Sequence, residues 1–253
     1  MSGAGTGPLL DARGLDLHYG RIQVLFGVSI AIERREMVAL LGTNGAGKST
    51  FLKAVSNLSP ISAGTVRFDG DDITGMPPDA IAALGLAHVP GGRGLLADLT
   101  VEENVRLGGH LLRRDRRALA EGMERAVALF PWIGVRRRQL AGTLSGGEQQ
   151  MLAIARALVT RPKMLMIDEL SLGLAPIIVE ELMGTLTALR DTGITILLVE
   201  QHATFAMQFC DRVLFMEKGE VRFSGAGTDL LGRDDLLRSV FLGGGLGAVA
   251  AGR

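Results

Sequence analysis

The sequence contains almost no cysteine and no excess of charge of either sign. Cys210 is the only cysteine among 253 residues, which excludes an intramolecular disulfide and a cysteine-rich zinc site. Lysine plus arginine and aspartate plus glutamate each number 27, so the formal net charge is zero and gives no indication of nucleic-acid or acidic-membrane binding. Recognition of a partner must therefore be local, and the single thiol fits the reducing cytoplasm.

Long apolar runs are also missing. The best run, Ile194–Val199, is stopped by Glu200, whereas a membrane-spanning helix needs about 18 uninterrupted apolar residues. The first 14 residues have no basic stretch followed by an apolar core, which is the pattern of a secretory signal. We therefore expect a chain that does not cross a bilayer by itself, with loose tails at 1–8 and 244–253.

The residues that are present predict an α/β fold. Short apolar runs at 37–41, 164–167 and 195–200 are each followed by a helix pattern, which is typical of buried parallel strands covered on both faces. Segments 9–19 and 28–32 instead alternate between apolar and polar residues, as strands with one exposed face do. We therefore expect a mostly parallel sheet with an additional, more exposed set of strands.

A glycine-rich motif follows the first apolar run and precedes a helix, which is the context that gives G-x-x-x-x-G-K-[ST] its meaning. The motif consists of Gly42, Thr43, Asn44, Gly45, Ala46, Gly47, Lys48, Ser49 and Thr50. Glycines let the backbone approach phosphate oxygens, and the helix directs its positive end at the anion. Lys48 would contact the β- and γ-phosphates, and the Ser49 hydroxyl would bind Mg²⁺. A glycine turn without function is the alternative.

Two carboxylates, Asp168 and Glu169, end the apolar run at 164–167, at the edge where open α/β sheets bind ligands. Successive strand residues point in opposite directions, so the two side chains cannot share one task. Asp168 fits a ligand of Mg²⁺ or of its water, and Glu169 fits the group that polarises an attacking water. Taken alone, the pair could equally cap the next helix.

The segment Ser145, Gly146, Gly147 and Glu148 has two interpretations that are compatible with each other. Ser145 and Glu148 have the spacing of a capping box at a helix N-terminus. Two glycines in a first helical turn cost up to about 1 kcal/mol each relative to alanine, which a cap alone does not explain. We therefore expect a phosphate group to contact the backbone there.

Together these motifs resemble the ATP-binding subunits of ABC transporters, over nearly the whole chain. Tyr19 is similar to the aromatic residue on which that family stacks adenine. Within the family, the segments LSGGEQQMLAIARAL (144–158), SLGLAPIIVEEL (171–182), LTVEENV (99–105) and ILLVEQHA (196–203) resemble the LivF type of the branched-chain amino acid uptake systems. The resemblance implies a P-loop NTPase fold that binds ATP and Mg²⁺ and hydrolyses ATP.

The resemblance also implies a domain organisation and an assembly. Residues 9–243 would form one ABC ATPase domain, with a core from 9–90 and 159–243 and a helical signature subdomain at about 91–158. Two such subunits would dimerise head to tail, with ATP between the phosphate loop of one and residues 145–148 of the other. A LivG-type ATPase or a second copy, two membrane permeases and an extracytoplasmic solute-binding protein would be partners, with the chain peripheral on the inner face of the cell membrane.

Four features depart from the family pattern. Arg35 and Glu36 stand where the family usually has Gly-Glu before the phosphate-loop strand. Gly91 stands where the family has glutamine or, in this type, glutamate, and Leu170 stands where proline usually follows the catalytic glutamate. The residue that senses the γ-phosphate directly follows the strand at 195–200. Ungapped spacing puts this switch at Gln201, although the family usually has histidine and His202 lies one residue later.

Other functions fit parts of this pattern. A soluble ABC ATPase that clamps a protein assembly, such as the iron–sulfur assembly type, fits the length, but the LivF-like segments disfavour it. A non-hydrolysing ATP-binding scaffold is a third interpretation, and measured phosphate release would distinguish it. Because other subunits select the solute, amides or urea are alternatives to branched-chain amino acids.

Overall fold

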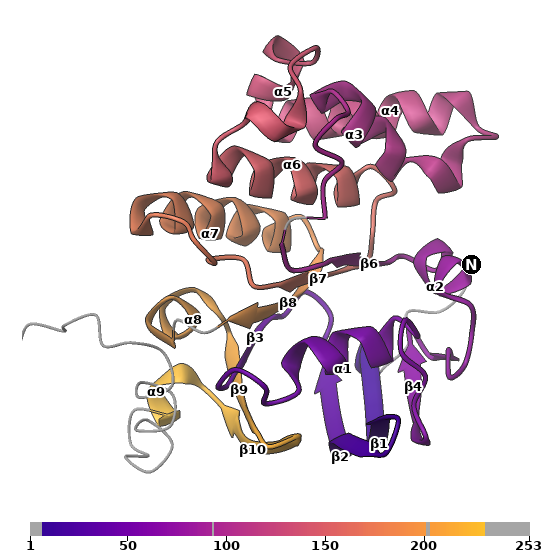
Figure 1. Cartoon of the computed structure of the whole chain (residues 1–253), viewed down its shortest axis with the longest axis vertical. Coiled ribbons are helices and arrows are strands. Elements are labelled where there is room, and N and C mark those ends of the chain that lie inside the picture. Colours follow the sequence, from indigo (N-terminus) through magenta and orange to yellow (C-terminus); the bar gives the residue numbers. More distant parts are fainter. Residues whose placement is uncertain (1–6, 93, 201–202, 231–253) are drawn as a thin grey trace, which may run out of the picture.

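The computed structural model describes residues 7–92, 94–200 and 203–230, and these form two sheets with a layer of helices. In Figure 1 the helical layer lies at the top, one sheet crosses the middle, and the other sheet lies below with helix α1 beside it. The α/β class expected from the alternating strand and helix patterns is confirmed.

The larger sheet has the strand order β10-β9-β3-β8-β7-β6. Its neighbouring strands from β9 to β6 are parallel, and only the β9–β10 pair is antiparallel. The strands are β3 (Met37–Leu41), β6 (Leu86–Val89), β7 (Met164–Asp168), β8 (Thr195–Glu200), β9 (Arg212–Glu217) and β10 (Glu220–Gly225). Every residue of β3, β7 and β8 is buried, which explains their continuous apolar sequences.

The smaller sheet is antiparallel and has the order β2-β1-β4-β5. Its strands are β1 (Leu10–Tyr19), β2 (Ile22–Ile32), β4 (Ala63–Phe68) and β5 (Asp71–Asp72). Strand β2 begins earlier than the expected 28–32 because the β1–β2 pairing continues through register shifts, with Leu17 opposite Leu25 and Leu15 opposite Val28. Such irregularities interrupt the alternation of residues on which a sequence-based boundary depends.

The helices surround the larger sheet on both faces (Figure 1). They are α1 (Lys48–Val55), α2 (Pro78–Ala83), α3 (Val101–Gly108), α4 (Arg116–Leu129), α5 (Pro131–Val135), α6 (Gly146–Leu158), α7 (Pro176–Asp191), α8 (Ala203–Phe209) and α9 (Gly227–Leu230). Alternate residues of β7 enter different cores: Met164 and Met166 pack with α1 and the smaller sheet, whereas Leu165 and Ile167 pack with α6 and α7. Both faces of β7 are therefore covered, and its carboxyl end is left to present polar groups.

Candidate nucleotide-binding site

The phosphate loop connects the end of β3 to the start of α1, as the motif predicts. Gly42 has a φ of 153°, and a Cβ there would lie 2.2 Å from the backbone oxygen of Met216 in β9. Gly47 is the N-cap of α1 and has a φ of 102° in the left-handed region. Because a side chain at either position would clash or be strained, glycine lets the loop fold back against β9 and then turn into the helix.

Lys48 is the first residue of α1, and its side chain is buried, with 6% of the residue exposed. Its Nζ donates hydrogen bonds to the carbonyl oxygens of Gly42 at 2.7 Å and Thr43 at 2.9 Å. An ammonium group has three N–H donors, so the geometry leaves a third for a phosphate oxygen. Burial lowers the pKa of Lys48, and the carboxylates of Glu169, Asp168 and Glu200 act in the opposite direction.

Asp168 lies at the end of β7 next to the phosphate loop, and Ser49 Oγ donates a hydrogen bond to its Oδ1 at 3.0 Å. Burial raises the pKa of Asp168, while the Ser49 hydrogen bond and the charge of Lys48 oppose that shift. A divalent cation would stabilise the ionised carboxylate.

The hydroxyl and carboxylate oxygens of this pair suit Mg²⁺, which prefers oxygen ligands. Among the described residues, no three histidine, cysteine, aspartate or glutamate side chains cluster in a way that could hold a metal. A nucleotide-bound Mg²⁺ takes one or two protein ligands and otherwise binds phosphates and water, and a hydroxyl beside a carboxylate can supply two such ligands. The donor set therefore fits Mg²⁺ held by Ser49 and Asp168.

Glu169 begins the turn after β7 and has an unusual backbone conformation. Its φ is 52°, and left-handed residues other than glycine cost about 1–3 kcal/mol. Its N–H donates to the carbonyl of Val199 in β8 at 3.0 Å. A Cβ at Gly91 would lie 3.4 Å from Glu169 Oε2 and 3.6 Å from Asp168 Oδ2. The structure thus brings position 91 close to the two carboxylates.

Two functional candidates were not apparent from the sequence. Glu200, the last residue of β8, is 2% exposed and accepts hydrogen bonds from the backbone N–H and the hydroxyl of Ser171. Ser171 lies in the same turn as Glu169 but 29 positions away from Glu200 in sequence. Their proximity follows from the parallel pairing of β7 with β8, which no local pattern indicates.

Tyr19 ends β1, and 45% of the residue is exposed. Its hydroxyl lies 3.2 Å from the Ser59 hydroxyl. The hydrogen bond with Ser59 lowers the pKa of Tyr19, burial opposes this, and Thr50 at the start of α1 lowers it further. The ring therefore lies beside the beginning of α1 with accessible surface, which is compatible with the predicted stacking of adenine.

Residues 145–148 begin α6 with a complete capping box. Glu148 Oε2 accepts hydrogen bonds from Ser145 N and Oγ, both at 2.9 Å, and Glu148 Oε1 pairs with Arg136 at 2.5 Å. These contacts lower the pKa of Glu148, with the backbone N–H of Ser145 as the main cause. The expected cap at this helix N-terminus is present.

The packing of α6 against α7 favours glycine at position 147, which the sequence did not indicate. It is buried in the first turn of α6, and a Cβ there would lie 2.5 Å from Cγ2 of Ile178 in α7. Glycine at position 147 therefore has a packing role in addition to the expected phosphate contact, because α6 and α7 approach too closely for a side chain.

We expect Gly147→Ala to lower the free energy of unfolding by about 1–3 kcal/mol, because overpacking outweighs the helix propensity of alanine. Thermal unfolding of the full chain measures this change. In an Ile178→Ala background the cost should nearly disappear, since Cγ2 is removed. Higher stability of the single variant would contradict the close contact.

The expected switch residue, Gln201, and its neighbour His202 lie outside the described residues. The preceding strand, β8, ends at Glu200, which agrees with the strand expected at 195–200. Gln201 therefore remains a prediction based on spacing.

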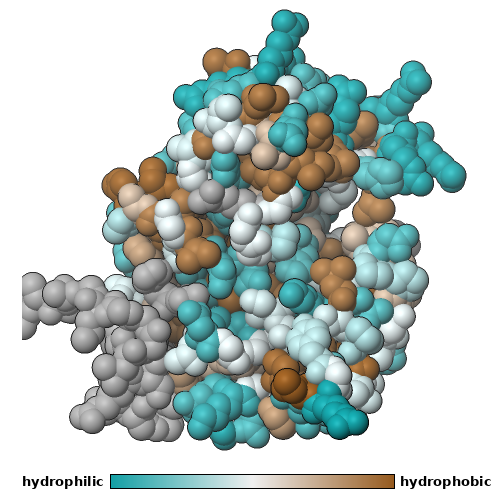
Figure 2. Space-filling model, in the orientation of Figure 1, coloured by the Kyte–Doolittle hydropathy of each residue, from teal (hydrophilic) through white to brown (hydrophobic). Residues whose placement is uncertain are grey.

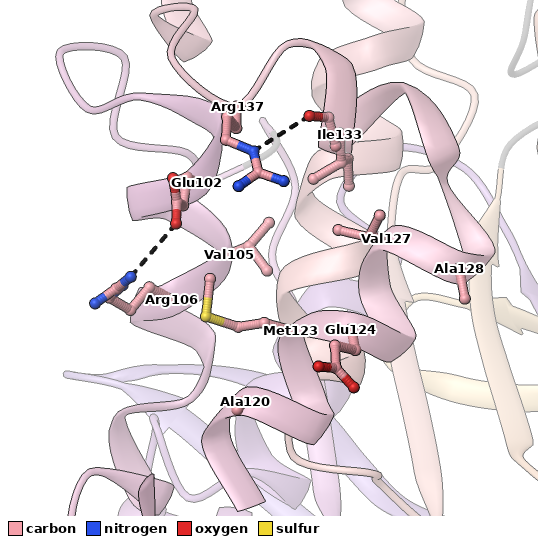
Figure 3. Close-up of a pocket in the computed structure, with 11 residues that line it drawn as sticks. Glu102, Val105, Arg106, Ala120, Met123, Glu124, Val127, Ala128, Ile133 and Arg137 are labelled. Carbon is pink, nitrogen blue, oxygen red and sulfur yellow. Dashed lines mark hydrogen bonds and ion pairs between the residues drawn. The ribbon is translucent and has the colours of Figure 1, made fainter. Parts of the chain in front are cut away.

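A separate pocket of about 490 Å³ lies within the helical layer, between α3, α4 and α5 (Figure 3). Its wall includes Val105, Met123 and Val127, and on its rim Arg106 pairs with Glu102 at 3.4 Å. An apolar wall with a neutralised rim does not suit a triphosphate. The phosphate loop is therefore the better candidate for the nucleotide.

Comparisons with known proteins agree with this geometry. Residues 25–171 match the family described as ABC transporter. The chain is 42% identical over 236 residues to the high-affinity branched-chain amino acid transport ATP-binding protein BraG of Pseudomonas aeruginosa, covering 93% of this chain and 100% of BraG. It is 37% identical to the probable branched-chain amino acid transport ATP-binding protein LivF of Archaeoglobus fulgidus, covering 86% and 92%. A solved ATP-binding cassette of an ABC transporter, in its ADP conformation, has a TM-score of 0.83 at 25% identity and covers 94% and 100%.

A phosphate loop and a strand-end carboxylate pair on a mostly parallel sheet define a P-loop ATPase. With the match over residues 25–171 and the 42% identity to BraG, the chain belongs to the ABC transporter family. It binds and hydrolyses ATP as an ATP-binding subunit of that family. The family, the fold and the ATPase activity expected from the sequence are confirmed.

Proposed function

We propose that the chain is the ATP-hydrolysing subunit of an importer for branched-chain amino acids. The observation that carries this proposal is the match with BraG over its whole length, since BraG is a branched-chain amino acid transport protein. LivF of Archaeoglobus fulgidus supports the same solute. Uptake of amides or urea is the alternative, because other subunits of such a system select the solute.

We further propose roles for the site residues. Residues 42–50 bind the phosphates of ATP, and Tyr19 stacks on its adenine. Ser49 and Asp168 hold Mg²⁺, which neutralises charge on the β- and γ-phosphates. Glu169 polarises the attacking water, and Gln201 contacts the γ-phosphate. The burial of Lys48 and Asp168 supports these roles, because charges act more strongly where water is excluded.

We propose a head-to-tail dimer in which residues 145–148 contact the ATP of the other subunit. Leu172, which follows β7, and Ile177, in the first turn of α7, are 56% and 69% exposed, and Ile177 precedes Ile178, the residue that approaches Gly147. Figure 2 shows hydrophobic side chains gathered in the region of α7. A second ATPase subunit, either LivG-type or another copy, would cover this apolar surface.

The remaining partners are two membrane permeases and an extracytoplasmic solute-binding protein, which place the chain peripherally on the inner face of the cell membrane. Among the described residues, no helix has the length and apolar character needed to cross a membrane. In this assembly residues 9–243 act as one ATPase domain, with the helical subdomain at about 91–158. A soluble ATPase of the iron–sulfur assembly type would instead co-purify without membrane proteins.

Deletion of the gene in its source organism should reduce uptake of radiolabelled leucine, isoleucine and valine at least about tenfold, because uptake against a gradient needs ATP hydrolysis. The full chain, or a Lys53→Ala variant on the exposed side of α1, should restore uptake, whereas Lys48→Ala should not. Loss of urea or amide uptake with normal leucine uptake would contradict the proposed solute. Normal uptake of all these solutes would contradict the transport role.

A further inference from the structure

Ser171 and Glu200 connect the turn that carries Glu169 to the end of β8. The backbone N–H of Ser171 donates to Glu200 Oε1 at 2.9 Å, and the Ser171 hydroxyl donates to Glu200 Oε2 at 2.6 Å. Both residues are buried, with 6% and 2% exposed. Two hydrogen bonds to one buried carboxylate fix position and orientation more strongly than neutral bonds at a surface.

A third hydrogen bond, also between the turn and β8, restrains the same turn. Glu169 N–H donates to the carbonyl of Val199, so consecutive residues of β8 hold Glu169 and Ser171. Between them lies Leu170, which is buried but lacks the ring that would fix the backbone if proline stood there. The left-handed conformation of Glu169 therefore depends on packing and on these hydrogen bonds.

Glu200 also lies near the phosphate loop. In the sheet it is opposite Leu41, the residue before Gly42, and its charge acts on Lys48. Ser171 is different, because its side chain bonds to Glu200 rather than to residues of the loop. Removing the Ser171 hydroxyl would thus loosen the turn while leaving Lys48 and its carbonyl partners in place.

We propose that Ser171 and Glu200 are positioning residues that hold Glu169 in its orientation for hydrolysis. The inference rests on the proposed catalytic role of Glu169. Since Ser171 acts on the turn and not on the phosphate loop, its hydroxyl contributes to the turnover rate and not to ATP affinity. A role limited to general folding would change stability, affinity and turnover together.

Ser171→Ala in the full chain should lower kcat for ATP at least about tenfold, while KM and the dissociation constant for ATP change less than about threefold. Ser171→Thr keeps a hydroxyl and should restore most of the rate. Ser56→Ala is the matched control, because Ser56 is also 6% exposed and its hydroxyl donates to Leu52 inside α1. That control should turn over at nearly the rate of the unmodified chain. If Ser171→Ala is not soluble, Ser171→Cys replaces it under the same criteria.

A second arm separates this inference from the role of Glu169. In a Glu169→Gln background, Ser171→Ala should cause no further loss of single-turnover hydrolysis, because the group that it orients is already removed. Wild-type turnover of Ser171→Ala, equal losses in ATP affinity and kcat, or failure of Ser171→Thr to restore the rate would each overturn the positioning role. Wild-type turnover of Glu169→Gln would instead contradict the proposed catalytic role.

Discussion

Replacing Lys48 by alanine is expected to weaken ATP binding by about 100-fold. The Lys48 ammonium lies inside the phosphate loop, where two carbonyl oxygens orient it. Hydrogen bonds to charged groups contribute about 1.5–3 kcal/mol each, and 1.4 kcal/mol corresponds to a factor of ten in affinity. Since Lys48 is buried, water replaces only part of the lost interaction.

Fluorescence titration with a nucleotide analogue measures this loss in the full chain. Lys53→Ala is the matched control, since it removes the same charge from the last turn of α1 at an exposed position. Its affinity should change less than about threefold, because an exposed charge is screened by water and salt. Equal losses for both variants would mean that net charge, and not the geometry of the loop, determines binding. Unchanged affinity of Lys48→Ala would contradict the phosphate site.

The parts of this fold that could be predicted are those with local patterns. Strands β3, β7 and β8 are continuous apolar segments, because both of their faces are covered, and their ends carry the phosphate loop, Asp168 and Glu200. The carboxylate pair at 168–169 was recognisable because it ends a buried strand in a chain that also contains a phosphate loop. The apolar runs and the polar motifs that follow them therefore indicated where the site lies.

Contacts that depend on strand order and helix packing could not be predicted. In the sequence, Glu200 is simply the residue that ends an apolar run. Its hydrogen bond with Ser171 could not be predicted, because the two residues come close only when β7 and β8 pair. The packing of Gly147 against Ile178 could not be predicted either, because Ile178 belongs to another helix. Both cases involve residues about 30 positions apart, for which a single sequence contains no periodic pattern.

Glu169→Gln is expected to retain ATP and to lose hydrolysis by about 100-fold or more, since a general base contributes about 10²–10⁴ to a rate. Asp168 would not replace it, because its Oδ1 accepts a hydrogen bond from Ser49 and the same carboxylate has the proposed role of binding Mg²⁺.

Steady-state phosphate release and ATP titration, measured on the same preparation, separate the two effects of this variant. Glutamine keeps the size of glutamate, so the turn held by Val199 should retain its shape. With ATP bound but not cleaved, dimers should accumulate in size-exclusion chromatography in the presence of ATP and dissociate in its absence. Glu180→Gln, the same chemical change on an exposed part of α7, should show normal release and no such dimers. Phosphate release at the wild-type rate by Glu169→Gln would mean that another group polarises the water, and Gln201 would then be the next residue to substitute.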